Sequence, residues 1–193
     1  MLKQFSPAIR ITLFFTVLTG IIYPGVVTGL CQLLFRNQAN GSLVSVNGQV
    51  VGSSLLGQNF AKPEYFQPRP SAAGNDGYDP TASAGSNLGP TNQKLIDRMK
   101  ASLDKFHKDN PDFSGPVPSD LVTASGSGLD PDLSPASALA QASRIAKTRG
   151  TTPDRVNELV ASHIQERQIG FLGERRVNVL ELNLALDRAL PLR

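Results

Sequence analysis

The stretch Ile11-Thr-Leu-Phe-Phe-Thr-Val-Leu-Thr-Gly-Ile-Ile-Tyr-Pro-Gly-Val-Val-Thr-Gly-Leu-Cys-Gln-Leu-Leu-Phe35 contains no Asp, Glu, Lys, Arg or His. As a helix rising about 1.5 Å per residue, these 25 residues extend about 37 Å, enough to cross a hydrocarbon core about 30 Å thick. A buried helix of this length would carry a polar stripe, and a cleaved signal has a shorter apolar core, about 7–15 residues. The sequence therefore predicts a single-pass transmembrane helix at residues 11–35, an N-terminal tail at 1–10 and an extramembrane domain at 37–193.

The formal net charge of +3 belongs to the flanks of this apolar segment. Lys3 and Arg10 precede it and Arg36 follows it, while the rest of the chain carries 16 basic and 16 acidic residues. A nucleic-acid-binding domain needs a basic face on its folded part, so no nucleic acid is expected as a partner. Because basic residues favour the cytoplasmic side, the bias predicts a cytoplasmic N-terminus and an extracytoplasmic domain.

Small residues and a proline indicate a packing surface on the apolar helix. Pro24 removes a backbone donor, a loss that neighbouring protein groups compensate better than lipid does. Gly25 and Gly29 have the small-xxx-small spacing that lets a second helix approach closely, and Gly20 extends the notch. Glycine is also common in membrane helices, so an unspecialised role stays open. We predict a helix-packing interface at Gly20, Pro24, Gly25 and Gly29.

The rest of the chain predicts an α+β domain with one β-hairpin and three to four helices. Asn47-Gly48 separates two short apolar runs, which is a strong signal for a two-residue hairpin turn. Helical periodicity with capping residues follows, although the last segment also fits strand alternation. The expected helices cover residues 92–107, 134–150, 152–164 and 178–190.

Residues 57–92 form a long segment rich in Gly, Pro, Ser, Asn and Asp. Loops of this length are usually either functional or disordered. This one contains Phe60, Tyr65, Phe66 and Tyr78, four of the twelve Phe and Tyr residues. The aromatic content favours an ordered loop packed on the domain, with disorder as the alternative.

A search for catalytic patterns finds only weak candidates. Ser102 and Lys105 have the spacing of a serine/lysine nucleophile pair, but they lie on the polar side of an expected helix without the companion motifs. Ser127 lies between two glycines without the spacing of a nucleophile elbow. Phosphate-binding glycine loops of the common spacings are absent from the sequence. We therefore predict no catalytic residue.

Metal and cofactor sites are not expected either. His107 and His163 lack the cysteine companions of a zinc site. Four aspartates depart from the calcium-loop spacing, and turn formation is a sufficient explanation for them. They are Asp76, Asp79, Asp130 and Asp132. These residues predict a membrane-anchored, non-enzymatic partner protein without a covalently bound cofactor, with an anchored extracytoplasmic hydrolase or transferase and a ligand-binding module as alternatives.

A series of motifs has a known parallel when taken in chain order. The motifs are Asn40-Gly-Ser-Leu43, Gly57-Gln-Asn-Phe60, Tyr65-Phe66 with Arg69-Pro-Ser-Ala72, Ser83-Ala-Gly-Ser-Asn-Leu88 with Thr91-Asn92, Val122-Thr-Ala-Ser-Gly-Ser-Gly-Leu-Asp-Pro131, Ser134-Pro135 and Arg176-Val-Asn-Val-Leu-Glu-Leu-Asn-Leu-Ala-Leu-Asp187. From the membrane segment nearly to the C-terminus, the chain resembles the C subunit of the bacterial Kdp potassium-transporting P-type ATPase. It departs from the family pattern at Asp132, where many relatives carry histidine, so a role of that histidine does not carry over.

The resemblance implies an accessory subunit of an inner-membrane complex that drives potassium uptake with ATP. The implied partners are a channel-like potassium-binding subunit, an ATP-hydrolysing subunit and a small one-helix subunit. The resemblance also implies a role in assembly and a catalytic-chaperone role, in which this subunit raises the nucleotide affinity of the ATP-hydrolysing subunit. Because ATP is cytoplasmic and the charge bias places residues 37–193 outside, we expect any effect on nucleotide to be indirect, with ATP met only in the complex.

Within such a complex, the 57–92 segment is the predicted contact with a partner subunit. Arg69 and Asn87 are expected to supply polar contacts. The full set of candidate contact residues is Tyr65, Phe66, Arg69, Ser71, Asn87 and Thr91.

Overall fold

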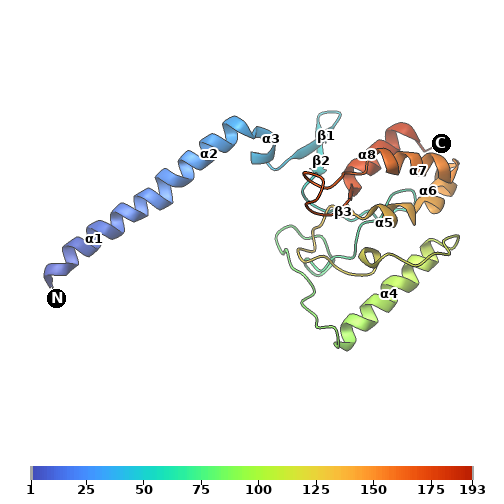
Figure 1. Cartoon of the computed structure of the whole chain (residues 1–193), viewed down its shortest axis with the longest axis horizontal. Helices are drawn as coiled ribbons and strands as arrows, with labels where there is room; N and C mark the ends of the chain where they lie inside the picture. The colour runs from blue at the N-terminus through green and yellow to red at the C-terminus, as the bar shows by residue number, and fades with distance from the viewer. Residues whose placement is uncertain (1, 193) are drawn as a thin grey trace. The chain divides into compact units, whose positions relative to one another are not determined.

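The computed structural model describes residues 2–192 of the chain. The chain divides into two compact units, residues 1–51 and residues 52–193. The first unit holds the apolar helix and most of a hairpin, and the second holds the α+β domain (Figure 1).

The apolar segment forms one continuous helical rod (Figure 1). It consists of α1 (Leu2–Val17), a π-helical turn η1 (Leu18–Ile22) and α2 (Tyr23–Leu34). Among the described residues, only Gln4–Leu34 is a helix long and apolar enough to cross a membrane, with 31 residues and a mean hydropathy of 1.8. The helix already begins at Leu2, so the described part of the predicted N-terminal tail at 1–10 is helical.

The π turn ends two residues before Pro24. The Tyr23 N–H donates to the Leu18 carbonyl, which is one residue further back than in an α-helix. Pro24 cannot donate at all, so the wider turn lies where the helical hydrogen-bond ladder is interrupted. Thr19 Oγ1 donates to the Phe15 carbonyl at 2.6 Å and satisfies one more acceptor in this region.

A short helix and a hairpin follow the rod. They are α3 (Arg36–Ala39), β1 (Leu43–Val46) and β2 (Gln49–Ser53). Asn47 and Gly48 have φ angles of +51° and +81°, the left-handed pair that a tight hairpin turn requires. The predicted hairpin is confirmed.

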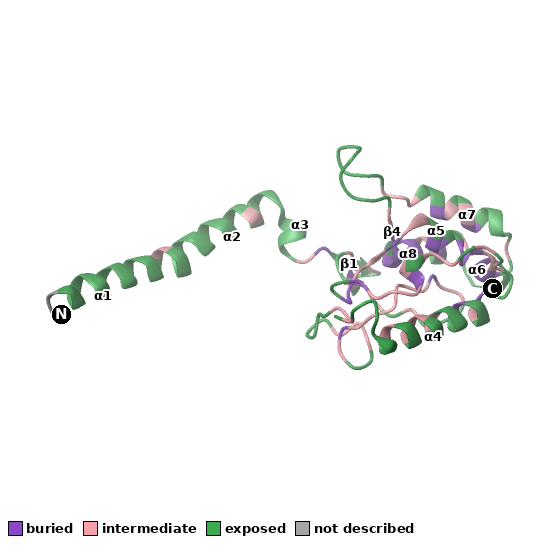
Figure 2. Ribbon diagram, turned by 60° about the horizontal axis from the view of Figure 1, so that its bottom comes forward, coloured by how far each residue is buried: buried purple, intermediate pink, exposed green. Residues whose placement is uncertain are grey.

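The second unit combines helices with one very short sheet. Its elements are α4 (Gln93–Asp109), the 3-10 turn η2 (Ser119–Leu121), β3 (Asp132–Leu133), α5 (Pro135–Leu139), α6 (Ala142–Arg149), α7 (Pro153–Ser162), β4 (Val177–Asn178) and α8 (Val179–Ala189). β3 pairs antiparallel with β4, with Asp132 opposite Asn178. Helices α5 to α8 gather on one side, and coil separates them from α4 (Figures 1 and 2). The predicted α+β class is confirmed.

Helix starts in this unit follow the capping residues. The side chains of Asn92, Ser134 and Asn178 accept hydrogen bonds from backbone N–H groups in the first turns of α4, α5 and α8. Each cap satisfies a donor that the helix leaves unpaired. The capping pattern therefore placed these three boundaries correctly.

The single helix expected at 134–150 is instead two helices. The helix is interrupted between α5 and α6, at Ala140 and Gln141. Gln141 is 1% exposed, and its amide hydrogen-bonds the backbone of Gln67 across the domain. The break turns Leu139 outward, where it is 44% exposed.

One apolar core joins the helices to the coil that precedes α4. Residues 54–92 contain neither helix nor strand, yet Phe66 from this segment is fully buried. The segment thus packs on the domain as the aromatic content predicted. The core residues are Phe66, Phe106, Leu121, Leu133, Ala138, Ala140, Ala142, Ile145, Ala146, Val156, Val160, Val177, Val179, Leu182 and Leu186.

Candidate functional site

Two buried amide side chains hold the centre of the 57–92 segment. Asn183 on α8 accepts from the Phe66 N–H at 2.8 Å and donates to the Phe66 carbonyl at 3.0 Å. The Gln141 side chain likewise accepts from the Gln67 N–H at 2.8 Å and donates to the Gln67 carbonyl at 3.0 Å. These amides supply the hydrogen bonds that a neighbouring strand would otherwise give to this extended backbone.

Arg144 on α6 connects the same segment to the end of α4. Its guanidinium donates to the carbonyls of Pro63 and Tyr65, and also to the Asn110 side chain at 2.9 Å and Gln141 at 2.7 Å. Burial lowers the pKa of Arg144 to about 10. Four hydrogen-bond acceptors surround the guanidinium and so offset the cost of burying its charge.

A second arginine, Arg149 on α6, joins the 57–92 segment to the end of α8; the contacts of Asn183, Gln141, Arg144 and Arg149 with this segment are here called the junction. Its side chain is 0% exposed and pairs with Asp187 at 2.7 Å, while further donors reach the carbonyls of Glu64 and Leu190. Its guanidinium also lies 5.1 Å from the centre of the Tyr65 ring. The Tyr65 hydroxyl donates to Asp187, and burial, followed by Asp187, raises the pKa of Tyr65.

Two ion pairs lie near the small sheet, and one of them holds Arg69 of the 57–92 segment. Arg69 pairs with Asp130 at 2.8 Å, and Arg176 pairs with Asp132 at 3.0 Å. Asn178 donates to Asp132 at 3.3 Å. Burial nevertheless raises the pKa of Asp132, because the loss of hydration outweighs the pull of Arg176. Asp132 is therefore a carboxylate tied to β4 and its flank.

Ser71 pins the segment to the glycine-rich turn before β3. Its hydroxyl donates to the Gly128 carbonyl at 2.6 Å and accepts from the Tyr78 N–H at 2.8 Å. Gly128 has a φ of +67°, and a Cβ there would come within 2.6 Å of the Ala84 carbonyl oxygen. Only glycine fits both the backbone angle and the close approach.

A cleft of about 390 Å³ opens between this segment and α4. Its walls combine aromatic and apolar side chains such as Phe60 and Phe106 with the polar groups of Arg69, Ser102 and Lys105. Lys105 pairs with Asp109 at 2.7 Å. The described residues show no hydrogen bond between Ser102 and Lys105, so the cleft offers a polar binding surface without an assembled nucleophile and base.

The predicted partner-contact residues fall into buried and exposed groups. Phe66 is 0% exposed, so its side chain serves the core and has no surface to offer a partner. Asn87 and Thr91 are exposed, and Asn87 has a φ of +50°. The half-buried residues, which make the internal contacts given above, are Tyr65, Arg69 and Ser71.

The predicted helix-packing residues lie together on the apolar rod. A Cβ added to Gly20, Gly25 or Gly29 would meet no atom within 4 Å. Pro24 is the second residue of α2, two positions after the end of the π turn. A packing interface at these residues stays a prediction.

The histidines and aspartates behave as ordinary structural residues. His163 Nδ1 lies 2.8 Å from the Leu159 carbonyl, and His107 is exposed at the end of α4. Asp79 accepts from the Thr81 N–H and hydroxyl, which lowers the pKa of Asp79. From residue 2 to residue 192, no group of three or more His, Cys, Asp or Glu side chains is placed to hold a metal ion.

Sequence reasoning missed the residues that hold the junction. Asn183 stands between Leu182 and Leu184 on the apolar face of its helix, and this position was a readable signal. Arg144 and Arg149 gave no such signal, because arginine on a short helix normally faces water. Their burial depends on backbone carbonyls that the coil brings from far away in sequence.

Comparison with known proteins gives a consistent result over the whole chain. The family model for the K+-transporting ATPase c chain, KdpC, matches residues 5–188. A protein of Gemmatimonas aurantiaca named potassium-transporting ATPase KdpC subunit is 55% identical over 187 residues, covering 97% of this chain and 94% of its own. Proteins of the same name from Myxococcus xanthus and Koribacter versatilis are 55% and 49% identical, covering 97% and 100% of this chain and 89% and 98% of their own.

Proposed function

This chain belongs to the KdpC family, the c chains of K+-transporting ATPases, and on that premise we propose that it is a non-catalytic accessory subunit supporting assembly of the pump. The observation that carries the proposal is the full-length similarity to KdpC subunits, in a chain whose described residues contain one helix able to cross a membrane. Such a subunit acts through contacts with its partners, and the chain offers the glycine notch of its membrane helix and the surface of its folded domain for them.

Helix packing is the proposed route of assembly in the membrane. Lipid gives no hydrophobic drive for helix association, so close backbone approach and interhelical hydrogen bonds must supply the affinity. The notch at Gly20, Gly25 and Gly29 permits such an approach, since no atom lies where their side chains would be. The proposed partners are a channel-like potassium-binding subunit, an ATP-hydrolysing subunit and a small one-helix subunit.

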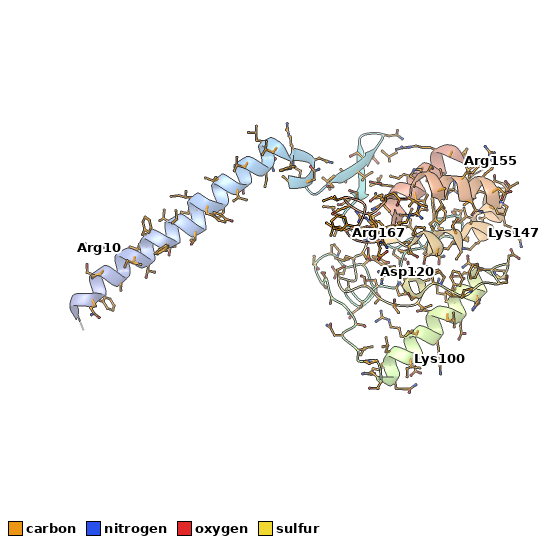
Figure 3. The ribbon with its side chains drawn as sticks, viewed as in Figure 1. Arg10, Lys100, Asp120, Lys147, Arg155 and Arg167 are labelled. Carbon is orange, nitrogen blue, oxygen red and sulfur yellow. The ribbon has the colours of Figure 1, made fainter. Side chains whose placement is uncertain are left out.

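The proposed location is the bacterial inner membrane, with a cytoplasmic N-terminus and an extracytoplasmic domain. The charge bias across the apolar helix supports this orientation. Lys100, labelled on α4 in Figure 3, is exposed and suits a test. Lys100→Cys in a Cys31→Ser background should react with an impermeant thiol reagent in intact spheroplasts. Labelling that requires permeabilised membranes would reverse the orientation.

We further propose that this subunit raises the nucleotide affinity of the ATP-hydrolysing subunit indirectly. With the domain outside, the membrane helix is the part of the chain that reaches toward the cytoplasmic side. ATP would then be a ligand of the complex and not of this chain alone. The apparent ATP affinity of the complex should fall when the notch is filled, and direct ATP binding by the full chain alone in detergent micelles would contradict the indirect route.

Deletion of this chain tests the accessory role. We expect the remaining subunits to lose co-purification and potassium-stimulated ATP hydrolysis, because an assembly contact is missing. Intact assembly together with unchanged potassium-stimulated hydrolysis would refute the proposal.

The cleft beside α4 favours a ligand-binding module as the second candidate function. Arg69 and Lys105 line it beside the aromatic ring of Phe106, and both cations are paired with carboxylates, so the cleft suits a small ligand with polar and apolar parts. An anchored hydrolase or transferase is the remaining alternative. Loss of function in Ser102→Ala or Ser127→Ala with assembly preserved would favour that enzyme, whereas the accessory role predicts no change.

A further inference from the structure

Residues 165–176 form a projecting loop, here called the finger, between α7 and β4. Gln165 and Arg176 exchange two backbone hydrogen bonds of 2.8 and 3.1 Å at its base. Gln168 and Leu172 exchange two more, both 2.9 Å, nearer the tip. Figure 2 shows this part of the chain as an exposed loop extending away from the body of the domain. The finger is thus a defined two-armed structure.

The tip of the finger is apolar and exposed. Ile169, Phe171 and Leu172 are 82%, 69% and 47% exposed. Single apolar residues on a surface are ordinary, but a contiguous group marks an interaction site. Ile169 also has a φ of +54°, a conformation that is unfavourable for a β-branched residue. The backbone therefore holds this side chain outward at an energetic cost.

Charges on the two arms are paired with one another. Arg167 pairs with Glu174 at 2.6 Å, and Arg175 donates twice to Glu166, at 2.7 and 3.0 Å. Arg167 is marked in Figure 3. At the base, Arg176 is held by the β3 carboxylate described above. The three arginines of the finger are thus each paired with a carboxylate, so the tip presents apolar surface without an unpaired cation beside it.

We propose that the apolar tip of the finger inserts into an uncharged apolar pocket on another protein subunit of the transport complex. This inference rests on the proposed function, because it requires that the chain be part of such a complex. Phe171 is the central anchor, since exposed aromatic residues that enter a pocket dominate binding energy. Cross-arm pairing stiffens the finger before binding and so reduces the entropy lost on association.

The charge pattern favours a protein pocket over a membrane surface. Loops that bind anionic lipid combine apolar side chains with free lysine or arginine that reaches the headgroups. In the finger, Arg167 and Arg175 are already paired with carboxylates that lipid phosphates would repel. A neutral apolar pocket matches this surface without breaking either pair.

A photocrosslinker at the tip tests the inference directly. Phe171→p-benzoylphenylalanine is introduced into the full chain, expressed with its partner subunits, and irradiated in native membranes. The expected result is a crosslink to one partner subunit. The matched control places the same group at Leu139, which is 44% exposed on α5. Crosslinking to lipid alone, no crosslink, or equal crosslinking from both positions would overturn the inference.

A dissociation measurement gives the strength of the contact. Ile169→Ser/Phe171→Ser should release the chain from the solubilised complex about thirtyfold faster, as expected for loss of an interface anchor. The melting temperature of the chain alone should not fall, because the tip is exposed and serine relieves the strain of a β-branched residue at position 169. If the wild-type chain never co-purifies with partners, the proposed function fails. If the wild type co-purifies and the double variant dissociates equally slowly, only the finger inference fails.

Discussion

Asn183→Leu removes the hydrogen-bond partner of both backbone groups of Phe66. The Asn183 amide is 2% exposed and reaches the Phe66 N–H and carbonyl at 2.8 and 3.0 Å. Leu has the same branching at Cγ but can neither donate nor accept. Each buried backbone group left unpaired costs about 1–3 kcal/mol, so the variant, which leaves two, should lose roughly 2–6 kcal/mol of unfolding free energy.

Thermal unfolding of the full chain in detergent micelles measures this loss. At about 2–4 °C per kcal/mol for a chain of this size, the melting temperature should fall by roughly 4–24 °C. Amide hydrogen exchange at Phe66 and Gln67 should become faster, because the coil loses its anchor. Asn157→Leu, the same change at a half-buried position on α7, is the control. Equal melting temperatures for the two variants would refute the claim that side-chain amides hold this segment.

Three further perturbations test other parts of the account. Gly25→Leu should weaken co-purification of the partner subunits by filling the notch, whereas Val26→Leu should not. Equal amounts of partner subunits co-purified with the two variants would refute the proposed helix contact. Gly128→Ala should cost at least about 1–2 kcal/mol because of its φ of +67°, while Gly89→Ala, with open space around it, should stay within about 0.5 kcal/mol. Burial raises the folded-state pKa of Asp132 above its ordinary 3.8. Between the unfolded-state and the folded-state pKa of Asp132, the folded chain therefore binds more protons than the unfolded chain. The unfolding free energy of the wild type relative to Asp132→Asn should therefore decrease as pH rises through this range, and then level off. An increase over the same pH range would contradict the burial argument.

Local chemistry made the membrane helix, the hairpin and the helix starts predictable. An uncharged run long enough to cross a bilayer has few alternatives, and Asn47-Gly48 adopts the turn because both residues tolerate left-handed backbone angles. Asn92 and Asn178 cap helices through their own side chains. Each of these features depends on residues close together in sequence.

Features that depend on distant contacts could not be predicted. β3 and β4 have two residues each, too few for a strand pattern to show in the sequence. The break between α5 and α6 accompanies the contact of Gln141 with Gln67, 74 positions away. The burial of Arg149 likewise depends on Glu64 and Asp187. Of the expected partner-contact residues, Phe66 is the one that the core encloses, and a contact through the other five stays a prediction.

Adding the purified full chain back to membranes that hold the other pump subunits tests the central claim most directly. Potassium-stimulated ATP hydrolysis is followed as the chain is titrated. The accessory role predicts a saturable rise in hydrolysis with the partners and none from this chain alone. A rate that does not respond to the added chain, or hydrolysis by the chain without its partners, would contradict the account.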